Sequence, residues 1–186
     1  MEPARARGEV ERIFSAVIDE LRPEQLVQRA LRLDAGAIWV EGERHSLPQG
    51  ARLVVVAIGK AAAGMAVGAE AVLDSRIDRG LVVTKRGFAD WPGLTHFELL
   101  EASHPVPDQS SLAAGQAALS AVAGLGADDL VLALISGGGS ALVEALRPGI
   151  TLDELASTTQ LLLRAGADIW LLNAVRQRLS LIKAGG

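Results

Sequence analysis

At 186 residues, 49% of them hydrophobic, the chain is long and apolar enough for one domain with a substantial core. Its net charge of -4, its lack of tyrosine and its few other aromatic residues argue against a nucleic-acid partner. It has no cysteine, no secretory signal and no run of about 20 strongly apolar residues. Disulfides and thiolate metal sites are therefore excluded, no membrane span is expected, and we expect a cytoplasmic protein.

Two helices and a small hairpin are expected in the first part of the chain. Apolar residues at helical spacing predict an amphipathic helix that ends before Pro23, with a second short helix after it. Alternating segments on either side of Glu41-Gly42 predict the hairpin. These elements are expected over residues 10–21, 24–31, 37–40 and 43–47.

From residue 52 onward, segments with strand patterns alternate with segments that have helical patterns. Strands are expected over 52–58, 80–84, 95–102 and 130–135, and helices over 60–73, 110–123, 152–165 and 168–182. This alternation predicts an α/β fold with a Rossmann-like parallel sheet and helices on both faces, in three layers. We expect residues 1–186 to form a single α/β domain. The final glycine pair is either a helix cap or the point where a second domain is missing.

The most informative stretch is a strand that ends in Ser136-Gly137-Gly138-Gly139-Ser140. The uninterrupted apolar run Leu130–Ile135 predicts a strand that is buried on both faces. Three glycines allow the backbone to approach a ligand closely, and we expect Ser140 to cap the helix that Ala141 begins. Exposed amides and the helix dipole would together bind an anion, and we expect that anion to be phosphate. The alternative is a flexible turn.

A second junction between a strand and a helix contains Gly59, Lys60 and Gly64. The two glycines match the outer positions of a dinucleotide-binding fingerprint, but Ala61 occupies the middle position, where the backbone must approach a pyrophosphate. A lysine at the start of a helix opposes the helix dipole, so we expect Lys60 to serve a ligand. The alternative is a solvated lysine whose stem packs on the sheet.

The segment His104-Pro105-Val106-Pro107-Asp108 follows another strand, and its two prolines stiffen the loop. We expect His104 to belong to the site, and we interpret His45 and His96 as ordinary surface residues. Two interpretations of Asp108 stay open. It either caps the helix that begins near Ser110 or has a catalytic or metal-binding role.

Near the end of the chain, Asn173, Arg176, Ser180 and Lys183 follow one another at spacings of three and four residues. On a helix these residues would form one stripe. Because the stripe mixes amide and hydroxyl groups with cations, we expect Asn173, Arg176 and Lys183 to contact an anionic substrate. The alternative is a solvated helix face.

Five collinear blocks carry a family resemblance: VVVAIGKAA, GLVVTKRG, EASHPVPDQSSLAAG, DDLVLALISGGGSALVEALRPGITL and LNAVRQRLSLIKAGG. Together they resemble the N-terminal domain of the MOFRL-type (class II) glycerate kinases, a family also labelled hydroxypyruvate reductase. Members of that family continue into a second, C-terminal MOFRL domain and have their active site in the cleft between the two. Gln177, Arg178 and Ala184 differ from the residues usual in the family.

The resemblance implies transfer of the ATP γ-phosphoryl group to the 2-hydroxyl of D-glycerate, with Mg²⁺. It implies that Gly59 and the loop Ser136–Ser140 bind the nucleotide and that Lys60 stabilises charge. His104 and Asp108 would activate the hydroxyl or contact Mg²⁺; no metal ligands are assigned.

This chain would then be the N-terminal part of a kinase, inactive without the missing domain in cis, and its unpaired face could form a homodimer. Two alternatives stay open. One is an NADP-linked reductase of 2-hydroxy acids, in which Lys85-Arg86 meets a 2′-phosphate. The other is a non-catalytic nucleotide-binding fragment.

Overall fold

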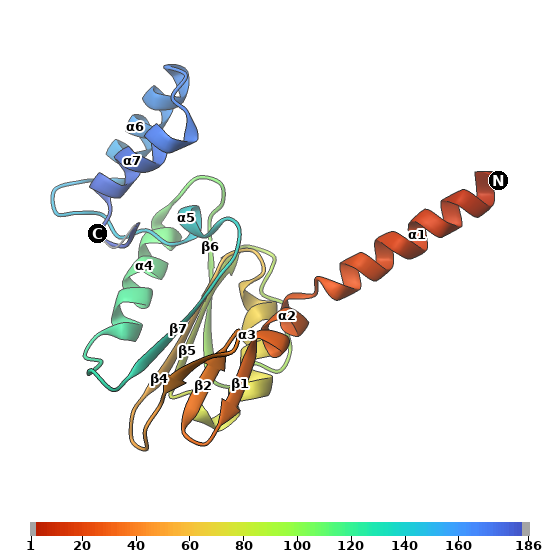
Figure 1. The fold of residues 1–186 in the computed structure, drawn as a ribbon. Helices are drawn as coiled ribbons and strands as arrows, with labels where there is room; N and C mark the ends of the chain where they lie inside the picture. Colours follow the sequence, from red (N-terminus) through yellow and green to blue (C-terminus); the bar gives the residue numbers. More distant parts are fainter. Residues whose placement is uncertain (1–2, 184–186) are drawn as a thin grey trace.

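The computed structural model of the protein describes residues 3–183 and contains one parallel sheet, one small antiparallel sheet and a set of helices (Figure 1). None of the described helices is long and apolar enough to cross a membrane. In chain order the elements are α1 (Pro3–Glu20), α2 (Pro23–Ala30), β1 (Leu31–Asp34), β2 (Ala37–Val40), β3 (Glu43–Ser46), β4 (Leu53–Ile58), α3 (Ala62–Leu73), the 3-10 helix η1 (Asp74–Arg76), β5 (Arg79–Lys85), β6 (Phe97–Ala102), α4 (Gln109–Val122), β7 (Leu130–Ile135), α5 (Gly139–Leu142), α6 (Leu152–Arg164) and α7 (Ile169–Leu179).

The central sheet has the order β6-β5-β4-β7, and all its strands are parallel. The two inner strands, β4 and β5, are almost entirely buried, as expected for parallel strands covered on both faces. The predicted Rossmann-like α/β architecture is therefore confirmed. All four carboxyl ends lie at one edge of the sheet, where ligands of such folds bind.

A separate hydrophobic core lies on each face of the sheet. On one face, α3 packs with α2 and the small sheet around residues such as Val55 and Leu73. On the other face, α4 and the short α5 pack on Val54, Val56 and Val83. Alternate residues of β4 thus enter opposite cores, which produces the three predicted layers.

The predicted hairpin is confirmed as β2 and β3, but it belongs to a sheet of three strands. The second helix ends at Ala30, one residue earlier than expected, and the chain continues as β1, with Leu31 opposite Val40. Leu31 is buried in the core under α3, and this burial favours the extended conformation.

The expectation that Leu130–Ile135 is buried on both faces is wrong. The strand β7 is at the edge of the sheet, and Val131 and Ile135 are 48% and 60% exposed. Both side chains are on the face that α4 covers elsewhere, and α4 contacts β4, β5 and β6 but does not extend over β7. An apolar run therefore predicted the strand correctly but not its position in the sheet.

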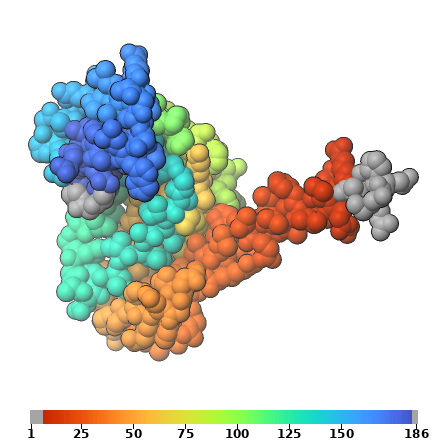
Figure 2. Space-filling view, turned by 45° about the horizontal axis from the view of Figure 1, so that its top comes forward, coloured from red at the N-terminus to blue at the C-terminus, as the bar shows by residue number. Residues whose placement is uncertain are grey.

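Two helical segments extend away from the sheet. Helix α1 projects into solvent at one end, and the pair α6 and α7 lies beyond the carboxyl edge (Figures 1 and 2). Apolar side chains remain exposed on both, for example Phe14 and Trp170, the latter 80% exposed. The last helix ends at Leu179, so the expected continuation to Ile182 is wrong. The departure from the family at Ala184 falls outside the described residues.

Candidate functional site

The two glycine junctions meet at the carboxyl ends of β4 and β7, which are neighbours in the sheet. The amide of Lys60 donates a hydrogen bond to the carbonyl of Gly137 at 3.0 Å. The amide of Ala61 donates to Ser136 Oγ at 3.1 Å, and the amide of Ser136 donates to Ile58 O at 2.9 Å. Two turns that are 75 residues apart in the sequence are thus joined into one structure.

Gly59 makes this close approach possible. Its φ is +128°, a conformation that residues with side chains rarely adopt. A Cβ atom at Gly59 would lie 2.6 Å from the carbonyl oxygen of Ser136 and closer still to Ser136 Oγ. Gly64, the other glycine of the fingerprint, is a packing position, because a Cβ there would meet Pro23 and Trp91. Close packing is also the role of the third glycine of the fingerprint, so Gly64 by itself argues neither for nor against a dinucleotide site.

The loop after β7 is held by its carbonyl groups, and its amides are left free. The carbonyl of Gly137 accepts from Lys60, that of Gly138 from Ala141, and that of Ser140 from the guanidinium of Arg176 at 3.0 Å. Within residues 3–183, no group accepts a hydrogen bond from the amides of residues 137–140. Consecutive free amides of this kind form a concave binding site for an anion.

Ser140 does not cap a helix, contrary to the sequence-based expectation. The N-cap of α5 is Gly138, whose φ is +93°, and α5 has only four residues. Because a left-handed backbone conformation is required at Gly138, glycine takes the position where a serine cap was expected. The loop therefore offers backbone amides to a ligand and not the dipole of a long helix.

Lys60 and His104 both lie close to Gly138. A Cβ atom on Gly138 would lie 3.0 Å from Cδ2 of His104 and 3.4 Å from Cε of Lys60. Lys60 is in the turn before α3, which begins at Ala62, so its expected position at the start of the helix is wrong. Its exposed side chain is nevertheless beside the free loop amides.

His104 is in an environment that favours its neutral form. Partial burial, and then the charges of Lys60 and Lys85, hold the pKa of His104 below the usual value of 6.5. A neutral imidazole can accept a proton, which a general base must do.

We expect the NMR titration midpoint of His104 to lie below pH 6.5 and to rise in the variant Lys60→Ala, because one neighbouring positive charge is removed. Because the pKa of His104 is lower in the folded chain than in the unfolded chain, the unfolded chain binds a proton at this residue at a higher pH than the folded chain does. The contribution of His104 to stability is therefore present above pH 6.5 and is lost as the pH falls. A wild-type midpoint above 6.5, or no rise in the variant, would contradict the assigned environment.

Asp108 caps α4, which was one of its two predicted roles. Its Oδ1 accepts from the amide of Ser110 at 2.9 Å, while Ser111 Oγ accepts from the amide of Asp108 in a capping box. Its Oδ2 accepts from Arg86 at 2.9 Å. Bonds from the Ser110 hydroxyl and amide, together with Arg86, lower the pKa of Asp108 against the effect of burial. Both carboxylate oxygens are thus engaged within the fold.

We expect Asp108→Ala to lower the free energy of unfolding by about 1 kcal/mol, as loss of an N-cap does. Asp108→Asn keeps an oxygen for the Ser110 amide and is expected to cost less. Denaturant unfolding measures both. If Asp108→Asn abolished turnover of the full-length protein without affecting stability, Asp108 would have a catalytic role as well.

The predicted stripe near the C-terminus is divided by the end of α7 at Leu179. Arg176 binds the glycine loop, and Lys183 lines a hollow of about 320 Å³ beside that loop. Ser180 is buried and donates to the carbonyl of Ala145 at 3.3 Å. Asn173 is exposed on α7 and is not among the residues that line the hollow. Of the three residues expected to contact a substrate, Arg176 and Lys183 thus lie at the glycine loop or its hollow.

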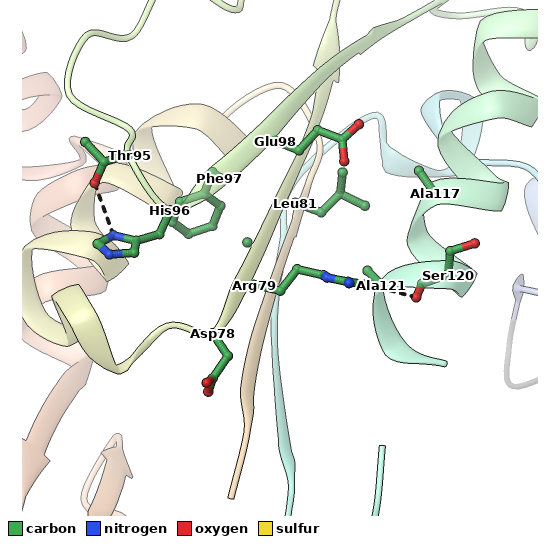
Figure 3. Close-up of a pocket in the computed structure, with 11 residues that line it drawn as sticks. Asp78, Arg79, Leu81, Thr95, His96, Phe97, Glu98, Ala117, Ser120 and Ala121 are labelled. Atoms are coloured by element: carbon green, nitrogen blue, oxygen red, sulfur yellow. Dashed lines mark hydrogen bonds between the residues drawn. The ribbon is translucent and has the colours of Figure 1, made fainter. Parts of the chain in front are cut away.

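A larger hollow, of about 710 Å³, opens at the opposite edge of the sheet, where β5 and β6 begin (Figure 3). Its one arginine, Arg79, donates to the carbonyl of Ser120 at 3.2 Å, and the carboxylates of Asp78 and Glu98 share the lining. A hollow whose one arginine is already bonded to a carbonyl, and which two carboxylates also line, does not favour a phosphate. The hollow beside the glycine loop is smaller but has the required chemistry.

His96 is not an ordinary surface residue, contrary to the expectation, whereas His45 is exposed on β3 as expected. The ring of His96 contacts Oε1 of the buried Glu70 at 2.7 Å, and the same oxygen accepts from the amide of Thr95. Burial raises the pKa of Glu70, but hydrogen bonds from His96 and Thr95 outweigh this effect and lower it. The pair joins α3 to β6 and is remote from the glycine loop.

The residues present do not fit a protein-held Mg²⁺ ion. Within residues 3–183, no group of three or more His, Asp or Glu side chains could hold a metal. Near the glycine loop, Asp108 is bound to Arg86 and Glu144 is paired with Lys183. The expected contact between Asp108 and Mg²⁺ therefore finds no support here.

The family model described as "Domain of unknown function (DUF4147)" matches residues 9–186. The chain belongs to this family. This family corresponds to the N-terminal domain of the MOFRL-type glycerate 2-kinases, which the sequence blocks resembled.

The relatives that match this chain are named glycerate kinase or putative hydroxypyruvate reductase. The chain is 37% identical to a glycerate 2-kinase of Pyrococcus horikoshii over 94% of its length and 38% of that protein. It is 44% identical to a D-glycerate 2-kinase of Thermotoga maritima, over 72% of the chain and 32% of that protein. The crystal structure of a glycerate kinase from Thermotoga maritima matches 98% of the chain, with a TM-score of 0.82 and 34% identity. The chain spans 41% of that structure, and thus less than half the length of these relatives.

Proposed function

We propose that this chain is the phosphate-binding part of a cytoplasmic glycerate 2-kinase, which transfers the γ-phosphoryl group of ATP to the 2-hydroxyl of D-glycerate. One observation carries the proposal: the free amides of residues 137–140 lie beside Lys60 and His104 at the carboxyl edge of the sheet. Phosphoryl transfer requires positioned donors and cations more than a covalent nucleophile. Family membership and the names of the relatives support the same reaction.

Each group has a role in this reaction. The loop amides bind phosphate oxygens, and the ammonium of Lys60 stabilises the negative charge that moves during transfer. The neutral imidazole of His104 accepts the proton of the attacking hydroxyl. Arg176, which donates to the carbonyl of Ser140, and Lys183, which lines the hollow, supply positive charge beside the loop for the anionic reactants, ATP and glycerate. We assign Asp108 to the fold and derive no step through Mg²⁺.

A C-terminal domain in cis would complete the site. The relatives are more than twice as long as this chain, and the glycine loop lies in an open hollow. Apolar side chains are exposed on α1, β7 and α7. We propose that the further domain covers part of this apolar surface and closes the site. Any homodimer would form through the apolar surface that the further domain leaves exposed.

The test of the function is a coupled assay for ADP release by the full-length protein, with and without D-glycerate. The proposal expects release that depends on glycerate, and no such release would refute it. The present chain alone is expected to bind ATP in a calorimetric titration but not to turn it over. If the full-length protein bound ATP without catalysis, the alternative of a non-catalytic nucleotide-binding protein would be favoured.

The NADP-linked reductase has less support. Ala61 occupies the middle position of the fingerprint, where glycine lets the backbone approach the pyrophosphate, and the amide of Lys60 is already bonded to Gly137. A fluorescence titration with NADPH separates the two hypotheses, because the kinase is expected to give no change.

A further inference from the structure

Glu144 is a fully buried carboxylate two residues after α5, with 0% of its surface exposed. Its backbone is fixed against α4, because its amide donates to the carbonyl of Ser111 at 3.0 Å. A Cβ atom on Gly115 of α4 would overlap the carbonyl of Glu144, so the two segments are in direct contact. A buried charge in such a rigid position requires a partner.

That partner is Lys183, whose side chain is only 13% exposed. Glu144 Oε2 accepts a hydrogen bond from Lys183 Nζ, which also lies 3.4 Å from the carbonyl of Val143. Glu144 Oε1 accepts from the amide of Ala145 at 3.1 Å. An ammonium group has three donors, so one remains for a ligand in the hollow that Lys183 lines.

The backbone on both sides of the ion pair is also fixed. The amide of Leu181 donates to the carbonyl of Ala145 at 2.7 Å, and the amide of Arg147 donates to the carbonyl of Leu179 at 3.0 Å. The segment after α7 is thus bound to the segment after α5 by the main chain alone. The ion pair is not needed to join them, and an apolar pair of similar volume would be at least as stable.

We propose that Glu144 is a positioning residue that holds the ammonium of Lys183 beside the glycine loop as a second cation for bound phosphate. Lys60 lies beside Gly138, and Lys183 lines the hollow formed by Gly139 and Ser140. The bound phosphate would therefore contact a lysine from each of two directions. This inference rests on the proposed binding of ATP at the loop.

The charge of Glu144 also keeps Lys183 protonated. Burial holds the pKa of Lys183 below its ordinary value; the hydrogen bond and charge of Glu144 oppose this in part, and the positive charge of Arg176 adds a smaller lowering effect. In Glu144→Gln we expect the pKa of Lys183 to fall, as measured by NMR titration of the lysine side chain. If Glu144 had only a structural role, which the glutamine amide could also fill, the pKa of Lys183 would not have to fall in this variant.

The decisive experiment is a calorimetric titration of the full chain with ATP at low ionic strength. Glu144→Gln and Lys183→Met are each expected to weaken ATP binding about tenfold or more, as loss of a charged hydrogen bond does. The double variant, which leaves no unpaired buried charge, is expected to fold and to bind ATP no more weakly than Lys183→Met. Glu98→Gln, at an exposed carboxylate of β6, is the control and should bind like the wild type.

Three results would count against the proposal. Wild-type affinity in Glu144→Gln would overturn it and leave the proposed function intact. Additive losses in the double variant would show that Glu144 does not act through Lys183, and would also overturn it. If the wild-type chain bound no ATP, the proposed function would fail in this chain and the inference would fail with it.

Discussion

Gly59→Ala is expected to destabilise the protein by about 2–5 kcal/mol, because it combines backbone strain with overpacking. At a φ of +128° the new methyl group would lie 2.6 Å from the carbonyl oxygen of Ser136. The loop after β7 would have to move away from β4, which would displace the free amides. We therefore expect the variant to lose ATP binding as well, measured by denaturant unfolding and calorimetric titration.

Gly137→Ala is the matched control, on the same loop. A Cβ atom at Gly137 would have no other atom within 4 Å, and its φ is not positive. We expect its stability to stay within about 1 kcal/mol of the wild type, since alanine adds no strain here. Equal losses in the two variants would show that glycine is needed for general flexibility and not for the close contact at Gly59.

Lys60→Ala is expected to reduce turnover of the full-length protein about 10²- to 10³-fold, as removal of one group that stabilises transition-state charge does. Because the side chain of Lys60 is exposed and is not part of either core, the unfolding midpoint should not change. Steady-state kinetics with ATP and D-glycerate, together with thermal unfolding, provide the measurement.

Arg44→Ala removes the same charge from an exposed position on β3, in the small sheet. It controls for the net charge of the protein and should leave kcat and KM unchanged. If Lys60→Ala behaved like Arg44→Ala, Lys60 would have no part in the reaction. The phosphate site would then consist of the loop amides and Lys183, which follows α7.

The pattern of the sequence predicted most of the elements because that pattern reflects local properties. Apolar runs such as Leu53–Ile58 and Leu130–Ile135 favour strands wherever they occur, and glycine clusters mark turns that other residues cannot make. The alternation of strands and helices restricted the topology to a parallel sheet. For the same reason, both glycine junctions and the loop with His104 could be expected at the carboxyl edge.

The errors share one physical cause, which is that burial depends on neighbours distant in the sequence. Nothing local to Val131 indicates that β7 is an edge strand, because that follows from the strand order. His96 resembled a surface residue until its contact with Glu70 was known, and Ser140 resembled a cap because the φ of Gly138 is a property of the folded loop. The prediction of one helical stripe near the C-terminus was wrong because the segment after α7 pairs with residues 145–147.

By itself the sequence determined the α/β class, the position of the two glycine turns at strand ends and the family of the protein. Only the tertiary structure decided that the two turns bind each other, that Lys60 and His104 lie beside Gly138, and that Glu144 pairs with Lys183. The physical reason is the range of the interactions. Backbone preferences act over a few residues, whereas hydrogen bonds and ion pairs at the site join groups between about 35 and 80 residues apart.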